Sequence, residues 1–299
     1  EPDLAGAPAG FEDFYGQTLD WTSCSGSDAG SYDCTDVTAP LDWTDPDAGT
    51  IQLALIRRAA TDGDALGSLL TNPGGPGASG YDLIADSASF AVSGPVLDAY
   101  YVIGFDPRGV GRSTAVTCLD AADMDRMLYD IPADPRGSQG WTDELTQRNT
   151  EFVDACEANS DGILPFVTTD NAARDMDLLR AVLGDNKLNY LGYSYGTFLG
   201  ATYAKLFPER VGRMVLDGAI DPSVSGLDVS TTQAIGFESA LRAYMADCLA
   251  GRGCPFSGTV DQAMADLGTL LASVDAKPLQ GDDGRMLGAD TLMTGIIAA

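Results

Sequence analysis

Apolar and polar positions along this chain follow patterns that predict both strands and helices. The run over 50–59 alternates, as a half-buried strand does. Shorter apolar runs that end in glycine, asparagine or aspartate predict buried strands at 67–72, 99–105, 189–193 and 213–219. Apolar residues at helical spacing predict helices over 170–184, 197–207, 233–250 and 260–274. Strands and helices therefore alternate through the middle of the chain.

That order predicts an α/β fold with a mostly parallel sheet and helices on both faces. In such sheets a binding or catalytic site lies beyond the carboxyl ends of the strands. Four chemically meaningful features follow strands directly: the Gly74–Gly75 pair, the Asp106–Arg108 turn, Ser194 and Asp217. We therefore expect a site at this edge of the sheet.

Ser194 lies at the centre of the motif Gly192-x-Ser194-x-Gly196, between a predicted strand and a predicted helix. This is the pattern of a nucleophile elbow, a sharp turn that exposes a serine hydroxyl. Glycine is needed two positions before and after the serine because a side chain there would collide with the neighbouring strand or helix. We predict that Ser194 is a catalytic nucleophile; the alternative is a serine that only caps the helix.

A glycine-rich loop, Asn72-Pro-Gly-Gly-Pro-Gly-Ala-Ser-Gly80, follows the strand at 67–72. Such a loop presents backbone N–H groups with no side chains in the way, as an oxyanion hole requires. It lacks the Lys-Ser/Thr end of a P-loop and the spacing of a dinucleotide motif, which argues against phosphate binding. An oxyanion hole is our interpretation, and a plain Pro/Gly turn is the alternative.

The chain has 299 residues and a net charge of −27. Such an excess of negative charge repels nucleic acids and anionic membrane surfaces, so we expect neither as a partner. No apolar run approaches the roughly 18 residues of a membrane span. The chain has no histidine and no Cys-x-x-Cys pair, which makes zinc a poor interpretation. We expect no metal and no cofactor.

Six cysteines, an even number, predict disulfide bonds. Two pairs are close in sequence and bracket short polar or glycine-rich loops, which leaves the other two cysteines to pair with each other. The predicted bonds are Cys24–Cys34, Cys248–Cys254 and Cys118–Cys156. Disulfides form in oxidising compartments, and the N-terminal sequence is typical of a processed mature end. We therefore expect a secreted protein.

Two stretches depart from the alternation of strands and helices. Residues 114–165 are polar and predict an irregular insertion. From residue 221 onward the pattern predicts helices, as in a helical lid, and the last residues resemble the middle of a helix. We expect residues 1–220 to form the N-terminal part of a core and residues 221–299 to begin a lid.

Four motifs together resemble one protein family. They are Asn72-Pro-Gly-Gly-Pro-Gly77, Phe105-Asp-Pro-Arg-Gly-Val-Gly-Arg-Ser113, Gly192-Tyr-Ser-Tyr-Gly-Thr197 and Phe207-Pro-Glu-Arg-Val-Gly-Arg-Met-Val-Leu-Asp-Gly218. Their order and spacing, over about residues 20 to 225, resemble the secreted tripeptidyl aminopeptidases of actinobacteria. Those enzymes are α/β-hydrolases related to proline iminopeptidases. The resemblance implies an α/β-hydrolase fold with a helical lid, and release of short peptides, such as tripeptides, from free N-termini.

The same resemblance implies a role for each motif. Ser194 would be the nucleophile that forms an acyl-enzyme. The oxyanion hole would use the backbone N–H of Tyr195 and that of Gly74 or Gly75. Asp106 and Arg108 would support the site without reacting.

The family also needs an aspartate and a histidine that follow later strands, and this chain holds no histidine. A serine without an imidazole has no general base near neutral pH. A sheet that stopped at 213–219 would leave an apolar edge bare. We therefore expect a partner, the C-terminal chain of the same hydrolase, to supply both residues, and this chain to be inactive alone.

Three functions remain open from the sequence. The first is a serine exopeptidase, whose substrate α-ammonium would pair with a carboxylate such as Asp217, Glu238 or Asp247; for each of these a solvated surface position is the alternative. The second is an esterase or amidase of small molecules or lipids, because a fold does not fix a substrate. The third is a non-catalytic binding protein that kept the fold without the base.

Overall fold

The computed structural model describes residues 2–4, 6–24 and 32–298. The chain divides into two compact units. The first comprises residues 1–117 and 160–222, and the second comprises residues 118–159 and 223–299.

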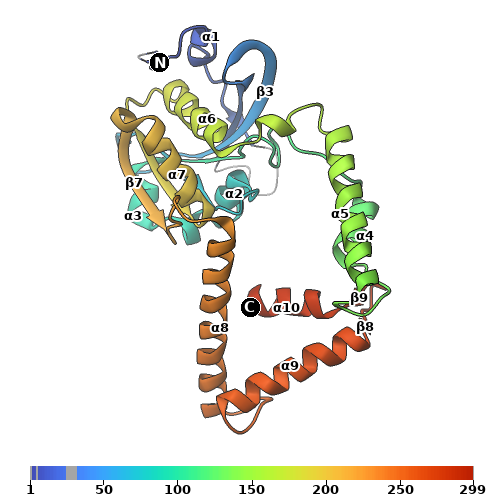
Figure 1. The fold of residues 1–299 in the computed structure, drawn as a ribbon. Coiled ribbons are helices and arrows are strands. Elements are labelled where there is room, and N and C mark those ends of the chain that lie inside the picture. Colours follow the sequence, from blue (N-terminus) through green and yellow to red (C-terminus); the bar gives the residue numbers. More distant parts are fainter. Residues whose placement is uncertain (1, 5, 25–31, 299) are drawn as a thin grey trace. The chain divides into compact units, whose positions relative to one another are not determined.

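A seven-stranded sheet forms the centre of the first unit (Figure 1). Its strands are β1 (Thr22–Ser23), β2 (Tyr32–Asp42), β3 (Asp45–Arg58), β4 (Ser68–Asn72), β5 (Tyr101–Phe105), β6 (Leu188–Tyr193) and β7 (Val211–Asp217). Their spatial order is β1-β2-β3-β5-β4-β6-β7. The pairs among β1, β2, β3 and β5 are antiparallel, and those from β5 through β4 and β6 to β7 are parallel.

The predicted strands are all present, but two features of the N-terminal hairpin differ from the expectation. β3 begins at Asp45, five residues before the predicted start at residue 50, because it extends along β2 in a long hairpin. The apolar pattern does not predict β2 at all. Its buried residues include Val37 and Ala39, which are small and separated by threonine, so the alternation is weak in sequence.

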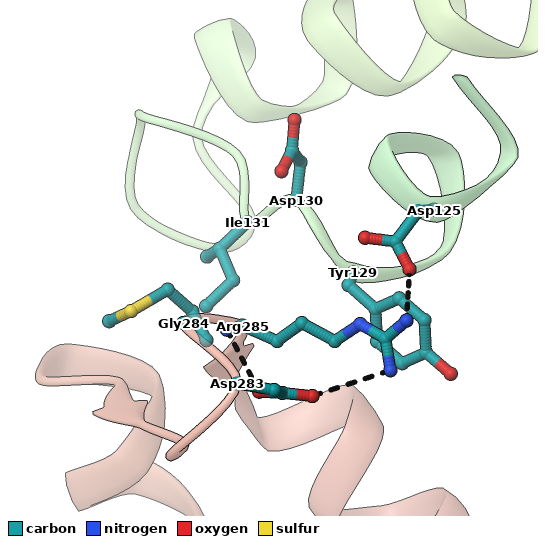
Figure 2. Close-up of a pocket in the computed structure, with 8 residues that line it drawn as sticks. Asp125, Tyr129, Asp130, Ile131, Asp283, Gly284 and Arg285 are labelled. Atoms are coloured by element: carbon teal, nitrogen blue, oxygen red, sulfur yellow. Dashed lines mark hydrogen bonds and ion pairs between the residues drawn. The ribbon is translucent and has the colours of Figure 1, made fainter. Parts of the chain in front are cut away.

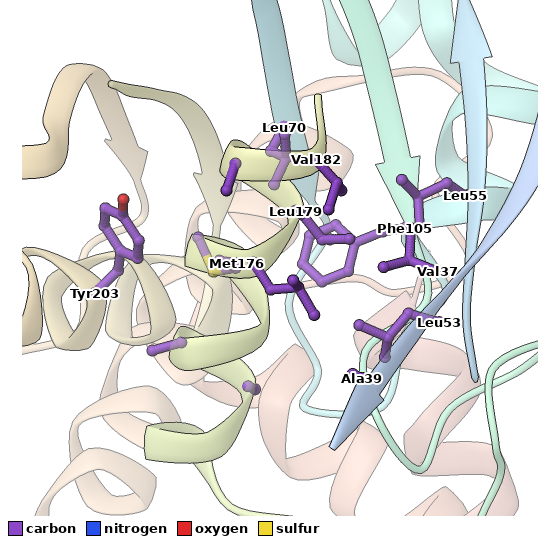
Figure 3. Close-up of a cluster of buried hydrophobic side chains, with 14 of the residues drawn as sticks. Val37, Ala39, Leu53, Leu55, Leu70, Phe105, Met176, Leu179, Val182 and Tyr203 are labelled. Carbon is purple, nitrogen blue, oxygen red and sulfur yellow. The ribbon is translucent and has the colours of Figure 1, made fainter. Parts of the chain in front are cut away.

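Alternate residues of the central strands face two different helical layers. On one face, Leu69 and Val102 pack with Ile84 of α2 (Gly80–Ala91) and with Leu97 of α3 (Gly94–Ala99). On the other face, the core includes Leu70 and is covered by the short α1 (Glu12–Tyr15), α6 (Thr169–Val182) and α7 (Tyr195–Leu206), as Figure 3 shows in part. The two-residue period of a strand thus produces a three-layer α/β/α unit, as predicted.

The second unit is mainly helical. It contains α4 (Ala121–Tyr129), α5 (Gln139–Asn159), α8 (Gly226–Ala250), α9 (Val260–Ala276), α10 (Ala289–Ala298) and the small ribbon of β8 (Leu279–Gln280) and β9 (Met286–Leu287). Met245 of α8 packs with Ala263 and Leu267 of α9 in a small core. None of the described helices is both long enough and apolar enough to cross a bilayer.

The segment 118–159 corrects two expectations. It forms the helices α4 and α5 instead of an irregular insertion, and it groups with residues 223–299 instead of with the core. Within α4 and α5 the only buried residue is Cys156, and the long α5 has no broad apolar face that would signal a helix in the sequence. The units also separate after Pro222.

The structure contains the three predicted disulfide bonds: Cys24–Cys34, Cys118–Cys156 and Cys248–Cys254. The loop inside the first bond, residues 25–31, lies outside the described residues. The second bond closes the base of the segment 118–159, and Asn159 Nδ2 donates a 2.7 Å hydrogen bond to the carbonyl oxygen of Cys118 beside it. The third bond closes the corner between α8 and α9.

Candidate active site

The serine of the predicted elbow lies in a strained and exposed turn. Ser194 stands between the end of β6 and the start of α7, with φ +53° and ψ −122°. It is one of two non-glycine residues with positive φ among those the structure describes. Its side chain is exposed and makes no capping hydrogen bond to α7. Backbone strain of this kind, at the tip of a strand, is typical of a nucleophile elbow.

The two motif glycines are required by close packing. A Cβ on Gly192 would lie 2.5 Å from the carbonyl oxygen of Gly196, and a Cβ on Gly196 would lie 2.8 Å from the carbonyl oxygen of Asn72 in β4. The hydroxyl of Tyr190 donates a 2.8 Å hydrogen bond to the Gly196 carbonyl. Burial raises the pKa of Tyr190, so this hydroxyl stays a neutral donor. The strand and the helix therefore meet at van der Waals distance on both sides of Ser194.

The strand β7 fixes the elbow from its other side. The N–H of Ser194 donates a 2.9 Å hydrogen bond to the carbonyl oxygen of Asp217. The Thr197 hydroxyl donates to the Ser194 carbonyl at 2.6 Å and accepts from the N–H of Ile220 at 2.9 Å. These bonds satisfy backbone groups that the strained turn would otherwise leave unpaired. They leave the Ser194 hydroxyl itself unengaged by the described residues.

The glycine-rich loop after β4 lies directly against the elbow. Gly74 has φ +99°, and a Cβ on it would lie 2.5 Å from the carbonyl oxygen of Tyr193 and 3.0 Å from both Ser194 Cβ and Tyr195 N. Glycine is the residue that permits both this conformation and this approach. The loop that the sequence predicts as an oxyanion hole is therefore next to the predicted nucleophile.

The amides of this loop are not equivalent. The N–H of Gly74 donates a 2.9 Å hydrogen bond to Asn72 Oδ1, so it is already engaged. The N–H groups of Gly75 and Tyr195 donate to no acceptor among the described residues. Tyr195 is the first residue of α7, where a backbone N–H has no acceptor within its own helix. The free N–H of Tyr195 thus lies at the elbow, at the positive end of a helix dipole, and the free N–H of Gly75 follows the residue that packs against it.

Asp106 holds the far end of the loop. Its carboxylate is fully buried and accepts hydrogen bonds from the Ser79 hydroxyl at 2.5 Å, the Tyr81 N–H at 3.2 Å and the Arg112 N–H at 2.8 Å. Ser79 is also the N-cap of α2 and accepts from the Asp82 N–H at 2.9 Å. The loop 73–78 is therefore anchored at its start by Asn72 and at its end by Ser79.

Arg108, which the sequence groups with Asp106, has another role. It is fully buried and forms a two-pronged ion pair with Asp175 of α6, at 2.7 and 2.6 Å. Its remaining hydrogen bonds go to the carbonyl oxygens of Pro40, Leu41 and Phe166. Its described partners thus belong to the β2 hairpin, α6 and the segment before α6. Arg108 supports the frame of the unit and makes no hydrogen bond to the elbow or the glycine loop.

Aromatic side chains flank Ser194. Tyr195 stacks on Phe198, with ring centroids 6.0 Å apart, and its hydroxyl lies 2.7 Å from that of Thr169. The Tyr193 hydroxyl donates to the carbonyl oxygen of Ala91. Burial, followed by the negative charge of Asp217, raises the pKa of Tyr193, so it remains a neutral donor. These contacts fix the residues on both sides of Ser194.

The three carboxylates considered for the substrate α-ammonium lie in different surroundings. Asp217 is exposed at the end of β7 in the first unit. Glu238 and Asp247 belong to α8 in the second unit, where Glu238 is paired with Arg242 at 2.9 Å. In the first unit, the backbone carbonyl oxygen of Asp217 accepts from the Ser194 N–H. The carboxylate of Asp106 accepts from the Ser79 hydroxyl and so helps to hold the end of the glycine loop.

A pocket of about 490 Å³ is found within the second unit and is separate from the elbow residues (Figure 2). Arg285 crosses it, with ion pairs to Asp125 at 2.6 Å and to Asp283 at 3.4 Å, and its guanidinium lies 4.7 Å from the centroid of the Tyr129 ring. Asp130 and Ile131 complete much of its wall. Arg285 offsets only part of the negative charge of the three lining carboxylates, and no serine, threonine or cysteine lines the pocket.

Residues 67–270 match the family model described as the alpha/beta hydrolase fold. The chain belongs to this family. The match includes the glycine loop, the elbow and β7. Among curated relatives, the chain is 38% identical over 298 residues to the serine protease Hip1 of Mycobacterium tuberculosis, covering 95% of this chain and 56% of that protein. It is 42% identical over 213 residues to the tripeptidyl aminopeptidase of Streptomyces coelicolor, covering 69% of this chain and 38% of that protein.

Another relative carries a different name. Carboxylesterase B of Mycobacterium tuberculosis is 38% identical over 287 residues, covering 93% of this chain and 54% of that protein. The chain thus spans about half the length of the curated relatives it matches, or less. Among solved structures, a proline iminopeptidase-related protein from Thermus thermophilus has a TM-score of 0.34 and 19% identity, over 60% of this chain and 43% of that one.

Proposed function

We propose that this chain is the nucleophile-bearing part of an extracellular serine exopeptidase that releases short peptides, such as tripeptides, from free N-termini. The observation that carries the proposal is the elbow itself: an exposed, strained Ser194 beside the unpaired N–H of Tyr195, with the glycine loop packed against it at Gly74. The names of two relatives, a serine protease and a tripeptidyl aminopeptidase, support the peptide substrate. The three disulfides support an oxidising, extracellular compartment.

The general base comes, in this proposal, from a second polypeptide, the C-terminal chain of the same hydrolase. The present chain has no histidine, and its relatives are much longer than the part it covers. β7 is the last strand of the sheet, and no described strand pairs with its outer edge. Val215 in this strand is 58% exposed. An unpaired apolar edge of this kind favours the addition of further strands, which would also bring the required aspartate and histidine.

The reaction would proceed through an acyl-enzyme. The Ser194 oxygen attacks the scissile carbonyl carbon while the partner's histidine takes the hydroxyl proton. The negative charge that develops on the carbonyl oxygen is stabilised by the N–H groups of Tyr195 and Gly75. The histidine then gives the proton to the leaving amine, and water hydrolyses the ester to release the short peptide. The proposal assigns no oxyanion role to the Gly74 N–H, because that group donates to Asn72 Oδ1.

A second candidate function is an esterase or amidase that uses the same machinery. The similarity to carboxylesterase B, at 38% identity over 93% of this chain, favours it. Both functions share the elbow and the oxyanion hole and differ in the leaving group. The residues that contact the leaving group would then decide which substrates are accepted.

The test uses the complete protein and a fluorophosphonate probe, followed by denaturing intact-mass analysis. The proposal predicts two polypeptides, with one probe adduct that maps to Ser194 and is absent from Ser194→Ala. Peptides with a free N-terminus, the same peptides acetylated, and a simple ester then separate the two candidate functions. An exopeptidase cleaves the free peptide and spares the acetylated one. Absence of any adduct on folded protein would refute both and favour a binding protein.

A further inference from the structure

Asn72 lies between β4 and the glycine loop, next to the start of α7. It is the last residue of β4 and is 1% exposed. Its Oδ1 accepts the hydrogen bond from the Gly74 N–H at 2.9 Å, two residues further along the chain. This is the pattern of an Asx turn, in which a side chain replaces the backbone acceptor and fixes the next residues. The side chain therefore decides how the glycine loop leaves the strand.

The same residue also touches the helix that follows the nucleophile. A Cβ on Gly196 would lie 2.8 Å from the carbonyl oxygen of Asn72 and 2.9 Å from its Oδ1. Gly196 follows Tyr195, the residue whose N–H is the other free donor. Asn72 thus contacts the start of α7 and holds the start of the loop that carries Gly75.

The Asn72 side chain accepts from the Gly74 N–H, and the Gly75 N–H next to it has no acceptor among the described residues. If the Asn72 side chain did not accept from Gly74, that N–H would compete with Gly75 for the same oxyanion. Gly74 has φ +99°, and a Cβ on it would clash with the Tyr193 carbonyl oxygen, so the loop has little room to adjust. A small rotation at Gly74 therefore moves the Gly75 amide relative to the elbow.

We propose that Asn72 is a positioning residue for the oxyanion hole: its side chain holds Gly74 so that the Gly75 N–H remains free to act with that of Tyr195. This inference rests on the proposed serine-hydrolase function. Asn72 itself does not react with the substrate, but its replacement should slow the chemical step. Asn72 is part of a motif in the sequence, but its side-chain role depends on a hydrogen bond that only the structure shows.

The adjacent strand offers a matched control. Asn189 in β6 is also buried, at 8% exposed, and its Oδ1 also accepts from a backbone N–H, that of Arg213 at 3.1 Å. It pairs with Leu69, near the start of β4, whereas Asn72 pairs with Gly192 at the carboxyl end. Both side chains thus stabilise the same region of the sheet, but only Asn72 adjoins the elbow.

The experiment compares Asn72→Ala, Asn72→Ser and Asn189→Ala in the complete protein. Hydrolysis of an activated ester gives kcat and KM, the fluorophosphonate gives the rate of Ser194 labelling, and thermal unfolding gives the melting temperature. We expect Asn72→Ala to lower kcat and the labelling rate about 10- to 100-fold with KM changed less than about threefold, the scale of a misplaced oxyanion donor. Asn72→Ser keeps a hydroxyl acceptor for the same turn and should recover part of the loss.

Asn189→Ala should lower the melting temperature by a similar amount and keep the kcat of the wild type. Equal kcat losses in the Asn72→Ala and Asn189→Ala variants, or an unchanged kcat in Asn72→Ala, would overturn the inference. If Asn72→Ala does not fold, Asn72→Ser against Asn189→Ser decides the question by the same criterion. A wild type that the probe does not label refutes the proposed function, and the inference with it. A labelled wild type with fully active Asn72 variants refutes the inference alone.

Discussion

Replacing Gly74 by alanine tests whether the glycine loop and the elbow act as one catalytic unit. The added Cβ would lie 2.5 Å from the Tyr193 carbonyl oxygen and 3.0 Å from Ser194 Cβ and Tyr195 N. Ordinary carbon contacts begin at about 3.5 Å, so the loop and the elbow must separate by roughly 0.5–1 Å. A misplacement of about 1 Å can cost about 100-fold in rate. We therefore expect kcat to fall by about two orders of magnitude.

Gly77→Ala is the control for backbone strain. Gly77 lies in the same loop at φ +101°, almost the value of Gly74, but a Cβ on it meets no atom within 4 Å. An L-residue in this conformation costs about 1–2 kcal/mol, and both variants carry that cost. Only Gly74→Ala adds the clash, which costs about 1–3 kcal/mol more. Gly77→Ala should lose stability and keep most of its kcat.

The assay is ester hydrolysis and fluorophosphonate labelling by the complete protein, with urea unfolding of the same samples. The reasoning predicts that stability falls in both variants and that activity falls in one. Comparable kcat values for Gly74→Ala and Gly77→Ala, at any stability, would show that the contact between the loop and the elbow does not position the reacting groups.

Three further predictions concern strain, burial and cross-linking. Ser194→Gly should abolish labelling. It should also raise the free energy of unfolding by about 1 kcal/mol relative to Ser194→Ala, because glycine accepts φ +53° without strain. Equal stabilities of the two variants in urea would contradict this. Arg108→Met should cost about 3–5 kcal/mol in urea unfolding, because the buried Asp175 would keep only its hydrogen bond from Trp43 and lose its counter-charge. Adding Asp175→Leu should recover part of the loss, and no recovery would refute the ion-pair explanation. Replacing Cys118 and Cys156 by serine should lower the free energy of unfolding by about 4 kcal/mol, and replacing Cys248 and Cys254 should lower it by about 2 kcal/mol. The difference arises because the two bonds close sequence separations of 38 and 6 residues. The reverse order in melting curves would contradict the loop-entropy argument.

The elbow could be predicted from sequence because its requirements are local. Gly192, Ser194 and Gly196 lie within five residues of each other, and the apolar strand before them and the helix after them are readable from hydrophobic periodicity. The fold class followed from the same alternation of strands and helices. Two of the three disulfides were also local, and the third pair followed from the even number of cysteines.

The helices of the second unit show where periodicity fails. α4 and α5 bury only Cys156, and the sequence of α5 lacks the apolar stripe that marks a helix against a core. β2 has a related difficulty, because its buried positions are filled by small residues. Their structure depends on neighbours that the local pattern does not reveal.

The sequence by itself determined the elbow around Ser194 and the type of fold, and it predicted a site at the carboxyl edge of the sheet, because each depends on short-range steric rules and on the period of burial. Only the tertiary structure decided which groups serve that site. It assigned Arg108 to a buried ion pair with Asp175, Asp106 to the anchor of the glycine loop, and the Gly74 amide to the side chain of Asn72. Hydrogen-bond partners are chosen by distance in space, and strands far apart in sequence bring those partners together.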